Sequence, residues 1–345
     1  MRNPQLSSGR RWRRALAIPL GLALVATACG DDDDDADDGD AAAETEAPDA
    51  DADAAADTEA PADTEAPADT EGADDASAET TGGEGSELLA ELQERGSVTV
   101  GLANEIPYGY ETEEGEIEGQ APDVARAVLA ELGIEEIDAE VVDFGALIPG
   151  LQAGQYDMIA AGMFITPERA EQIIFSDPDY CSTYAFAVPE GNPLGIEGDF
   201  SSIVDTGASL AVLSGAVDED YANDAGVPAD QIELFADVNA QYDALLAGRV
   251  DAVGGTSLTV LNQVEANESE MDATEAFVPL DAEGEEVLGC GGYGFIDQGF
   301  RDAFNEVLRD LIADGTVEEI VTSYGFAPEE VQTAAELTVE DLAGG

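Results

Sequence analysis

The sequence predicts an α/β fold, and three observations predict it. Short, mostly apolar runs, such as residues 98–102 and 158–161, are typical of buried β-strands. Amphipathic segments with helix-end signals lie between these runs. The part of the chain from about Ser86 onward has roughly 250 residues, which is enough for one domain of two lobes.

The first half of this region predicts alternating strands and helices. Residues 98–102, 139–142 and 158–161 are expected strands, and residues 122–132 and 146–153 are expected helices. Pro122 lies in the first turn of the expected helix 122–132 and Gly133 follows its end, the usual asymmetry of helix ends. Thr166-Pro167-Glu168-Arg169 has the sequence of a capped helical turn.

A second set of elements follows. Residues 184–188, 210–213, 250–253 and 292–296 are expected strands, and residues 240–247 and 317–324 are expected helices. A glycine turn at 214–216 leads into another helix. Between 300 and 312 the apolar residues Phe300, Phe304 and Leu308 share one side of a long amphipathic helix. These repeated units favour sheets covered by helices, although the pattern leaves open which strands pair.

Residues 1–28 are typical of an export signal. A basic segment with five arginines precedes a short apolar stretch, too short for a comfortable membrane span, which ends in small residues before Cys29. This ending resembles a bacterial lipobox, whose cysteine is lipidated and becomes the first mature residue. The alternative is an ordinary signal peptide followed by a chance cysteine. The Arg10-Arg11 pair leaves both general and twin-arginine export open.

Residues 29–86 are an expected disordered linker. They include the acidic run 31–35 and the repeat Asp-Thr-Glu-Ala-Pro-Ala at 57–62 and 63–68. The stretch lacks aromatic residues and has almost no large aliphatic ones, so it cannot bury enough apolar surface to offset its chain entropy. We expect it to hold the folded part away from the membrane.

The charge of the chain is extremely negative. After Cys29 there are six arginines, no lysine or histidine, and all 78 acidic residues, a formal charge of −72. This excludes binding of nucleic acid or of an anionic membrane through a basic patch. The excess of acid can serve solubility alone, or it can be an adaptation to a salty medium in which counterions screen the self-repulsion.

Two further cysteines, Cys181 and Cys290, lie in the folded part. Export permits a disulfide between them. With no histidine in the chain, a zinc site and a Cys–His nucleophile are essentially excluded, and neither a metal nor a cofactor is expected.

Several segments resemble one known family. They are Phe144 to Gly154 followed by Tyr156-Asp157, Ala161 to Arg169, Phe175 to Pro178, Ala247 to Val253 and Phe300 to Asn305. Their order and spacing resemble the extracellular solute-binding proteins of family 3, the polar-amino-acid type that serves ABC importers. The likeness covers nearly everything from Ser97 to Phe326.

The resemblance implies a two-lobed periplasmic-binding-protein fold of type II, with two hinge strands and the ligand in the cleft between the lobes. Lobe one would comprise 97–182 and 293–326, lobe two 183–292, and residues 327–345 a C-terminal tail. Cys181 and Cys290 would then lie beside the two hinge crossings, where either a disulfide or two free thiols would fit.

Within the family the chain most resembles the ectoine/hydroxyectoine-binding proteins, through residues 103–110, 163–166 and 179–181. The resemblance implies that Arg169 holds the carboxylate of the ligand, which a guanidinium fork fits bidentately. The backbone N–H of Val217 in lobe two would meet the same carboxylate, near the start of a helix.

The cation side departs from relatives that bind α-amino acids. Those relatives hold an ammonium group with a backbone carbonyl, matched here by Gly162, with a threonine, replaced by Phe164, and with an aspartate, replaced by Thr256. A buried ammonium group would lose hydrogen bonds of roughly 1–3 kcal/mol each. The chain is therefore poorly suited to an ordinary α-amino acid.

Aromatic residues stand at these positions instead. Tyr108, Phe144 and Phe164 match ligand-facing positions, and three rings suit a flat, delocalised cation at about 0.5–2 kcal/mol per contact. Glu105, on the loop before Tyr108, could accept N–H groups from that cation. Ectoine, a cyclic amidinium with a carboxylate, fits this set. Taken alone, Phe164 would more often be a core residue and Glu105 a surface acid.

The resulting hypothesis is non-catalytic capture of ectoine or hydroxyectoine by lobe closure and delivery to an ABC permease. We expect an exported, lipid-anchored monomer that touches the membrane through its N-terminal lipid only. The alternatives are a binding protein for another zwitterion or polar amino acid, an enzyme of the dehydratase type on the same fold, and a receptor module. An enzyme would need a general acid or base in the cleft, where only Glu105 is a candidate.

The acidic composition predicts stabilisation by salt. Raising NaCl from about 0.1 M to about 1 M shortens the Debye length from ~10 Å to ~3 Å and should raise the melting temperature. Thermal unfolding followed by circular dichroism tests this. A melting temperature that stays flat across this range would contradict adaptation to salt.

Overall fold

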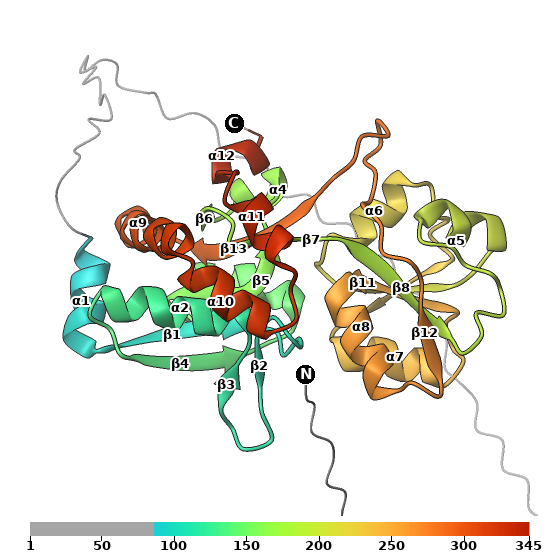
Figure 1. Ribbon diagram of the computed structural model, residues 1–345, viewed down its shortest axis with the longest axis horizontal. Coiled ribbons are helices and arrows are strands. Elements are labelled where there is room, and N and C mark those ends of the chain that lie inside the picture. Colours follow the sequence, from blue (N-terminus) through green and yellow to red (C-terminus); the bar gives the residue numbers. More distant parts are fainter. Residues whose placement is uncertain (1–85, 345) are drawn as a thin grey trace, which may run out of the picture. The chain divides into compact units, whose positions relative to one another are not determined.

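The computed structural model describes residues 86–344. The expected signal segment, Cys29 and the expected linker up to residue 85 lie outside the described residues. The described chain has the mixed α/β architecture that the sequence predicts, with two separate sheets and a small hairpin (Figure 1). None of the helices in this part of the chain is long and apolar enough to cross a membrane.

The first sheet has the strand order β4-β1-β5-β13-β6, and β7 also pairs with β13. Strand β1 runs parallel to β4 and β5, whereas β13 runs antiparallel to β5, β6 and β7. The bounds are β1 (Ser97–Leu102), β4 (Glu136–Val141), β5 (Met158–Phe164), β6 (Ile174–Phe175), β7 (Tyr180–Ser182) and β13 (Gly289–Phe295), with the hairpin strands β2 (Tyr110–Glu111) and β3 (Ile117–Glu118) beside them.

Helices from both ends of the described chain accompany this sheet. Helix α2 buries Val124, Val128 and Leu129, and α9 buries Phe300, Phe304 and Leu308, so each supplies the apolar face that its spacing predicts. The helices of this region are α1 (Glu87–Arg95), α2 (Gln120–Glu131), the 3-10 turn η1 (Phe144–Ala146), α3 (Leu147–Gln152), α4 (Pro167–Ala170), α9 (Gln298–Asp314), α10 (Thr316–Ser323), α11 (Pro328–Ala334) and α12 (Val339–Leu342).

The second sheet has the order β10-β9-β11-β8-β12. Strand β9 is parallel to β10 and β11, and β8 is antiparallel to β11 and β12. Its strands are β8 (Tyr184–Pro189), β9 (Leu210–Leu213), β10 (Ile232–Phe235), β11 (Ala252–Thr256) and β12 (Met271–Ala273), and its helices are α5 (Phe200–Thr206), α6 (Asp218–Asp224), α7 (Val238–Leu246) and α8 (Ser257–Ala266).

The chain passes between the sheets twice. It leaves the first sheet after β7 and enters the second at β8, and it returns to the first sheet with β13. Cys181 on β7 is paired directly with Cys290 on β13, and the two cysteines form a disulfide. The disulfide therefore joins the outgoing and the returning strand beside the crossings.

The C-terminal residues form helices where the sequence suggested only a tail. Helix α11 packs against β7, and Ala334 on α11 is buried against Cys181 and Cys290. Leu337 and Leu342 pack against the same cluster. The C-terminal helices therefore cover the disulfide and belong to the folded body.

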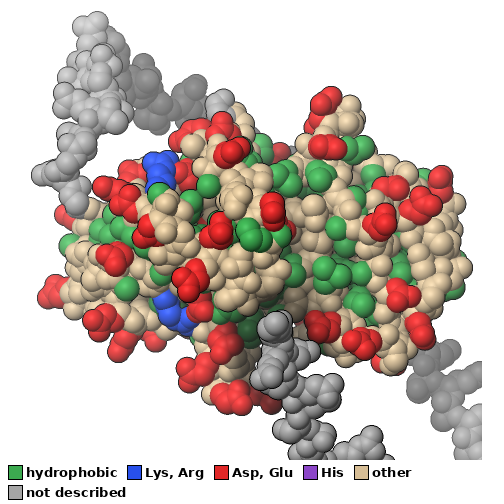
Figure 2. All heavy atoms as spheres, in the orientation of Figure 1, with side chains coloured by type: hydrophobic (Ala, Val, Ile, Leu, Met, Phe, Trp, Pro, Cys, Tyr) green, Lys and Arg blue, Asp and Glu red, His purple; other side chains and the backbone are tan. Residues whose placement is uncertain are grey.

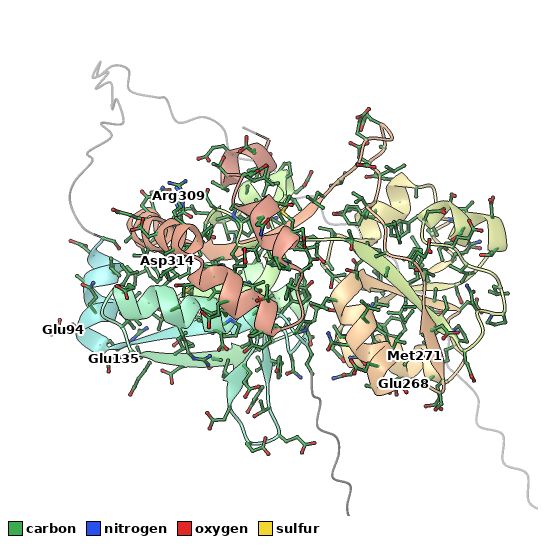
Figure 3. All side chains as sticks on the ribbon, in the orientation of Figure 1. Glu94, Glu135, Glu268, Met271, Arg309 and Asp314 are labelled. Carbon is green, nitrogen blue, oxygen red and sulfur yellow. A yellow bond between two sulfur atoms is a disulfide. The ribbon has the colours of Figure 1, made fainter. Side chains whose placement is uncertain are left out.

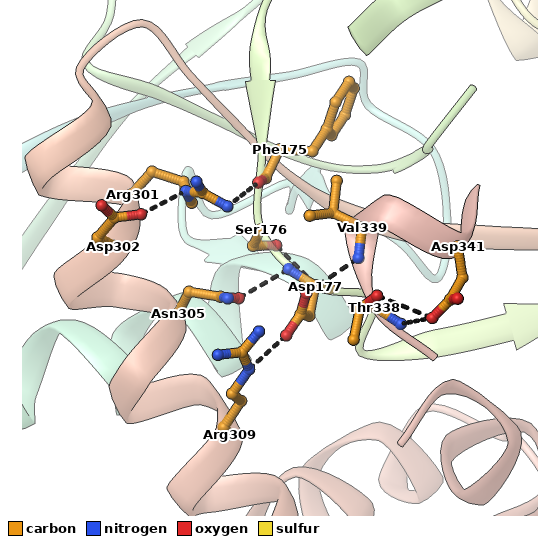
Figure 4. A network of polar contacts seen from close by, with 10 residues as sticks. All are labelled: Phe175, Ser176, Asp177, Arg301, Asp302, Asn305, Arg309, Thr338, Val339 and Asp341. Atoms are coloured by element: carbon orange, nitrogen blue, oxygen red, sulfur yellow. Dashed lines mark hydrogen bonds and ion pairs between the residues drawn. The ribbon is translucent and has the colours of Figure 1, made fainter. Parts of the chain in front are cut away.

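The buried side chain of Asp177 holds this arrangement together (Figure 4). Its carboxylate accepts hydrogen bonds from the Arg309 guanidinium, which extends from α9 (Figure 3), and from the Val339 N–H at the start of α12 at 3.0 Å. Its own backbone N–H donates to Asn305 at 2.7 Å. One aspartate thus connects the strand before the crossing with α9 and with the C-terminal helix.

The strand and helix boundaries differ from the expected ones where local signals are weak. Strand β13 begins at Gly289, three residues before the expected start, because four glycines among its seven residues give no side-chain pattern to follow. Strand β11 begins at Ala252 rather than at residue 250. The sequence analysis also missed several elements whose amphipathic or alternating patterns are brief. They are the helices α1, α5, α8, α11 and α12 and the short strands β2, β3, β6, β7, β10 and β12.

Acidic side chains are spread widely over the face shown in Figure 2, with few basic ones between them. Five of the six arginines form ion pairs with aspartate or glutamate. The exposed pairs, those of Arg95, Arg126 and Arg249, each contribute little to stability, about 0–1 kcal/mol, whereas the Arg309 pair involves the buried carboxylate of Asp177.

The Asp177 network predicts a specific loss of stability. Asp177→Asn keeps the shape but replaces one acceptor oxygen by a donor, so it should lower the free energy of unfolding by about 1–3 kcal/mol. Asp310→Asn removes the same charge from an exposed position on α9 and should change it by less than about 0.5 kcal/mol. Urea unfolding of both variants compares them; equal effects would contradict the anchoring role of Asp177.

Candidate functional site

A pocket lies between residues of the first sheet region and residues of the second. The empty space between them is about 540 Å³, part of which is open to solvent. The first region contributes Glu105, Tyr108, Phe144, Gly162, Phe164 and Arg169. The second contributes Leu213, Ala216, Val217, Asp218, Val238, Gln241, Tyr242, Gly254, Gly255, Thr256 and Thr259. All eight residues that sequence reasoning assigned to the ligand lie around this one pocket.

Glu105 and Tyr108 come from one tight loop after β1. Glu105 and Gly109 exchange two backbone hydrogen bonds of 2.9 Å, which closes the loop on itself. The closed loop holds both side chains against the pocket. Tyr108 is almost fully buried, and its hydroxyl has no hydrogen-bond partner among the described residues.

The Tyr108 ring lies over Gly162 of β5. A Cβ atom at Gly162 would come 2.4 Å from this ring, and the backbone there has a φ of +63°, so only glycine fits the position. The Gly162 carbonyl accepts a hydrogen bond of 2.6 Å from the Tyr180 hydroxyl. The Tyr180 ring in turn lies 5.3 Å from Tyr108, centroid to centroid. The Gly162 carbonyl therefore already accepts one hydrogen bond, and packing between Gly162 and Tyr180 fixes the position of the Tyr108 ring.

Phe164, at the end of β5, lines the pocket in a similar way. Its ring lies over Gly289 of β13, where an added Cβ would come 1.9 Å from the ring. Phe144, in η1, lies 5.5 Å from the Arg169 guanidinium, measured to the ring centroid. Both phenylalanines are more than nine-tenths buried while facing the pocket.

Arg169 belongs to the short helix α4, which begins as the sequence predicts. The Thr166 hydroxyl caps it by accepting from the Arg169 N–H at 3.3 Å. The guanidinium donates from Nη1 to the Phe164 carbonyl at 2.7 Å and from Nη2 to the Gly215 carbonyl at 3.0 Å. The second bond crosses from one side of the pocket to the other.

Arg169 differs from the other arginines of the chain. It is only 7% exposed, and it is the one arginine that forms no ion pair with a carboxylate in the described chain. Its two acceptors are neutral carbonyls, and the nearby carboxylate of Asp218 acts on its charge without forming an ion pair with it. A buried cation without a partner is unfavourable. The arrangement is suited to an anionic group that arrives from outside.

The turn after β9 faces Arg169. Val217 precedes α6, whose first N–H groups have no acceptor within the helix. Gly215 has a φ of +79° and lies directly against Gly145 of η1, so that a Cβ at Gly215 would come 2.6 Å from the Gly145 Cα. This close approach brings the two walls of the pocket together beside the guanidinium.

A chain of hydroxyl groups crosses the pocket at its other end. The Thr256 hydroxyl donates to that of Thr259 at 3.0 Å, and Thr259 donates to the Glu105 carboxylate at 2.7 Å. Thr256 thus acts on Glu105 through Thr259. Sequence reasoning placed Thr256 in the pocket but did not identify Thr259, its neighbour on α8.

Burial dominates the titration of the acids in the pocket. It raises the pKa of Glu105 to about 7, although the Thr259 hydrogen bond opposes the shift. Burial likewise raises the pKa of Asp218, the first residue of α6, to about 6, with the Arg169 charge among the opposing influences. Burial lowers the pKa of Arg169, and the nearby carboxylate of Asp218 counters this.

Sequence reasoning missed the helical part of the second wall. Val238, Gln241 and Tyr242 share one face of α7, and Asp218 begins α6. The spacing i, i+3, i+4 on α7 is a signal for one buried face. Nothing in the sequence says that this face meets a pocket, because the pairing of β9 and β11 decides where α7 lies.

The comparisons with known proteins agree on one family. The description "bacterial extracellular solute-binding proteins, family 3" matches residues 98–327. A probable amino-acid ABC transporter periplasmic-binding protein of Sinorhizobium fredii is 33% identical over 261 residues, covering 75% of this chain and 86% of its own. The lysine/arginine/ornithine-binding periplasmic protein of Escherichia coli is 31% identical over 193 residues, covering 53% and 69%.

The solved structures include a similar protein with a bound ligand. The crystal structure of EhuB in complex with hydroxyectoine has a TM-score of 0.67 and 34% identity, and the match covers 74% of this chain and 97% of that chain.

The buried acids predict how the stability of the ligand-free protein depends on pH. The folded state binds protons at Glu105 and Asp218 at a higher pH than the unfolded state, whose values lie near 4.5 and 3.8. The contribution of these two groups to the free energy of unfolding should therefore be greatest below about pH 4. It should fall as the pH rises from about 4 to about 7.

Glu105→Gln should reduce this loss between pH 5 and pH 8 by on the order of 2 kcal/mol. Asp218→Asn should also reduce it. Asp224→Asn, an exposed change at the end of α6, controls for the loss of one negative charge. Urea unfolding at constant ionic strength measures the difference; a Glu105→Gln slope equal to that of the control would contradict the assignment.

Proposed function

The chain belongs to the bacterial extracellular solute-binding proteins of family 3, and on that premise we propose that it captures ectoine or hydroxyectoine for import. Members of this kind are the substrate-binding proteins of ABC importers of the amino-acid type. The ligand is the part that we propose. One observation carries the proposal: the buried Arg169, without a carboxylate partner, shares its pocket with three aromatic side chains and Glu105.

The anion side of the pocket suits a carboxylate. The guanidinium of Arg169 has N–H groups beyond the two that bond carbonyls, and a carboxylate can accept two of them in parallel. The turn that ends in Val217 offers backbone N–H groups from the opposite wall. Such a contact would supply the directly bonded carboxylate that Arg169 lacks among the described residues.

The cation side suits a flat, delocalised charge more than an ammonium group. The Gly162 carbonyl already accepts from Tyr180, which leaves it less available for an amine. The Thr256 hydroxyl donates its proton to Thr259, so towards a ligand it offers only an uncharged acceptor oxygen. Glu105 remains as the charged acceptor, and the faces of aromatic rings attract a cation. The amidinium ring of ectoine has N–H groups for Glu105 and a flat surface for the rings.

The similarity to EhuB, whose structure holds hydroxyectoine, supports the same ligand class. The runner-up is a polar amino acid, since one relative is a lysine/arginine/ornithine-binding protein. In either case we propose that the protein acts without catalysis, as an exported monomer tethered by a lipid on Cys29, and delivers its ligand to a permease. Contacts that already cross the pocket, Arg169 to Gly215 and Thr259 to Glu105, would hold the lobes closed around the ligand.

Isothermal titration calorimetry of the purified protein tests the ligand. Ectoine and hydroxyectoine should bind, while glycine betaine, glutamine and arginine should bind at least tenfold more weakly or not at all. Tight binding of glutamine or arginine with none of ectoine would refute the assignment and favour the runner-up.

Two substitutions test the roles within the pocket. Arg169→Ala and Phe164→Ala should each weaken ectoine binding tenfold or more, which corresponds to at least about 1.4 kcal/mol. Arg249→Ala, at an arginine whose side chain is 63% exposed, and Phe235→Ala, outside the pocket, are the matched controls and should bind like the wild type. Wild-type affinity of either pocket variant would show that its assigned role is wrong.

A further inference from the structure

The side of the pocket formed by α6 and α7 carries buried polar groups that take no part in the ligand contacts proposed above. Gln241 and Tyr242 are 2% and 3% exposed, and both line the pocket. The Gln241 Nε2 and the Tyr242 hydroxyl are buried and have no hydrogen-bond partner in the described part of the chain. Asp218, 6% exposed, lines the same wall.

These groups are held in place by the fold. The helix α7 begins at an Asp237 cap, whose carboxylate accepts from the Ala240 N–H at 2.9 Å. Val238, Gln241 and Tyr242 then fall on one face of that helix and point to the pocket. The Asp218 carboxylate accepts a long hydrogen bond of 3.4 Å from the Leu213 N–H, and the Tyr184 hydroxyl also stabilises its charged form. Two carboxylate oxygens can accept about four hydrogen bonds, so there is room for another donor.

The chemistry of the three groups is complementary to a hydroxyl. The Gln241 amide nitrogen donates, the Asp218 carboxylate accepts, and a phenol can do both. Burial and the charges of Glu105 and Asp218 raise the pKa of Tyr242, so its hydroxyl stays protonated and can donate as well as accept. A ligand hydroxyl accepts one hydrogen bond and donates another, so it can pair with a donor and an acceptor of this wall at once.

We infer that Gln241, Tyr242 and Asp218 form a subsite for a hydroxyl group of the ligand, so that the pocket favours hydroxyectoine over ectoine. The inference rests on the proposed function and specifies the substrate further. A site with buried polar groups discriminates strongly against a ligand that cannot pair with them, because those groups are then left without partners. Arg169 and the aromatic side chains recognise what the two ligands share, while this wall recognises the difference between them.

The test is a comparison of the two ligands by isothermal titration calorimetry with the purified full chain. The wild type should bind hydroxyectoine about tenfold more tightly than ectoine, the effect of one well-made hydrogen bond. Tyr242→Phe and Gln241→Met remove one polar group each with little change in volume. Each should lower the ratio of hydroxyectoine affinity to ectoine affinity at least threefold.

Tyr221→Phe is the matched control, since Tyr221 is a buried tyrosine of α6 that does not line the pocket, and its ratio should equal that of the wild type. Equal wild-type affinities for the two ligands, or equal losses for both ligands in the variants, would overturn the subsite while leaving ectoine capture standing. A wild type that binds neither ligand would instead refute the proposed function, and this inference with it. Melting temperatures of the variants show that the protein is folded in each titration.

Discussion

The organisation of the pocket depends on one buried charge, the guanidinium of Arg169. Among the residues that the structure describes, each of the other five arginines is paired with a carboxylate, most of them at the surface. Arg169 is buried, and the protein offers it only backbone carbonyls, one from each wall of the pocket. A buried ion keeps such a position only where the structure gains something for it, and here the gain is a strong attraction for an anion. The same guanidinium bridges the walls, so the charge that would hold the ligand also brings the two sides together.

The positions of the aromatic side chains Tyr108 and Phe164 depend on two glycines. Tyr108 rests on Gly162 and Phe164 on Gly289, and in each pair a single Cβ atom would overlap the ring. The two glycines lie in neighbouring strands of the first sheet, so the hydrogen-bonded sheet fixes the positions of the rings that pack on them. A flat cation needs ring faces at fixed positions more than it needs acceptors that adjust. The raised pKa of Glu105 has the same origin, since the wall that excludes water from the rings also removes it from the carboxylate.

The framework around the crossings is reinforced separately from the pocket. The disulfide ties β7 to β13, and the C-terminal helices cover it. Asp177 connects the segment before the crossing with α9 and α12 (Figure 4). These links all lie on the first-sheet side, so the second sheet can change its position without breaking them. Acidic groups spread over the surface keep such a body soluble, at the expense of repulsion that counterions must screen.

The sequence by itself determined the elements with strong periodicity and the residues within recognisable motifs. The long helix α9, the capped turn of α4 and the strand β9 follow from short-range signals, and the motifs indicated Arg169, Phe164 and Glu105, which the structure brings together around one pocket. Only the tertiary structure decided the rest, because it depends on contacts between segments far apart in the chain. Thr259 meets Glu105 across 154 positions of sequence, and Gln241 and Tyr242 reach the pocket only because the strand order of the second sheet carries α7 there. The C-terminal helices become part of the body because the disulfide strands offer an apolar surface, which no local pattern near residue 330 reveals.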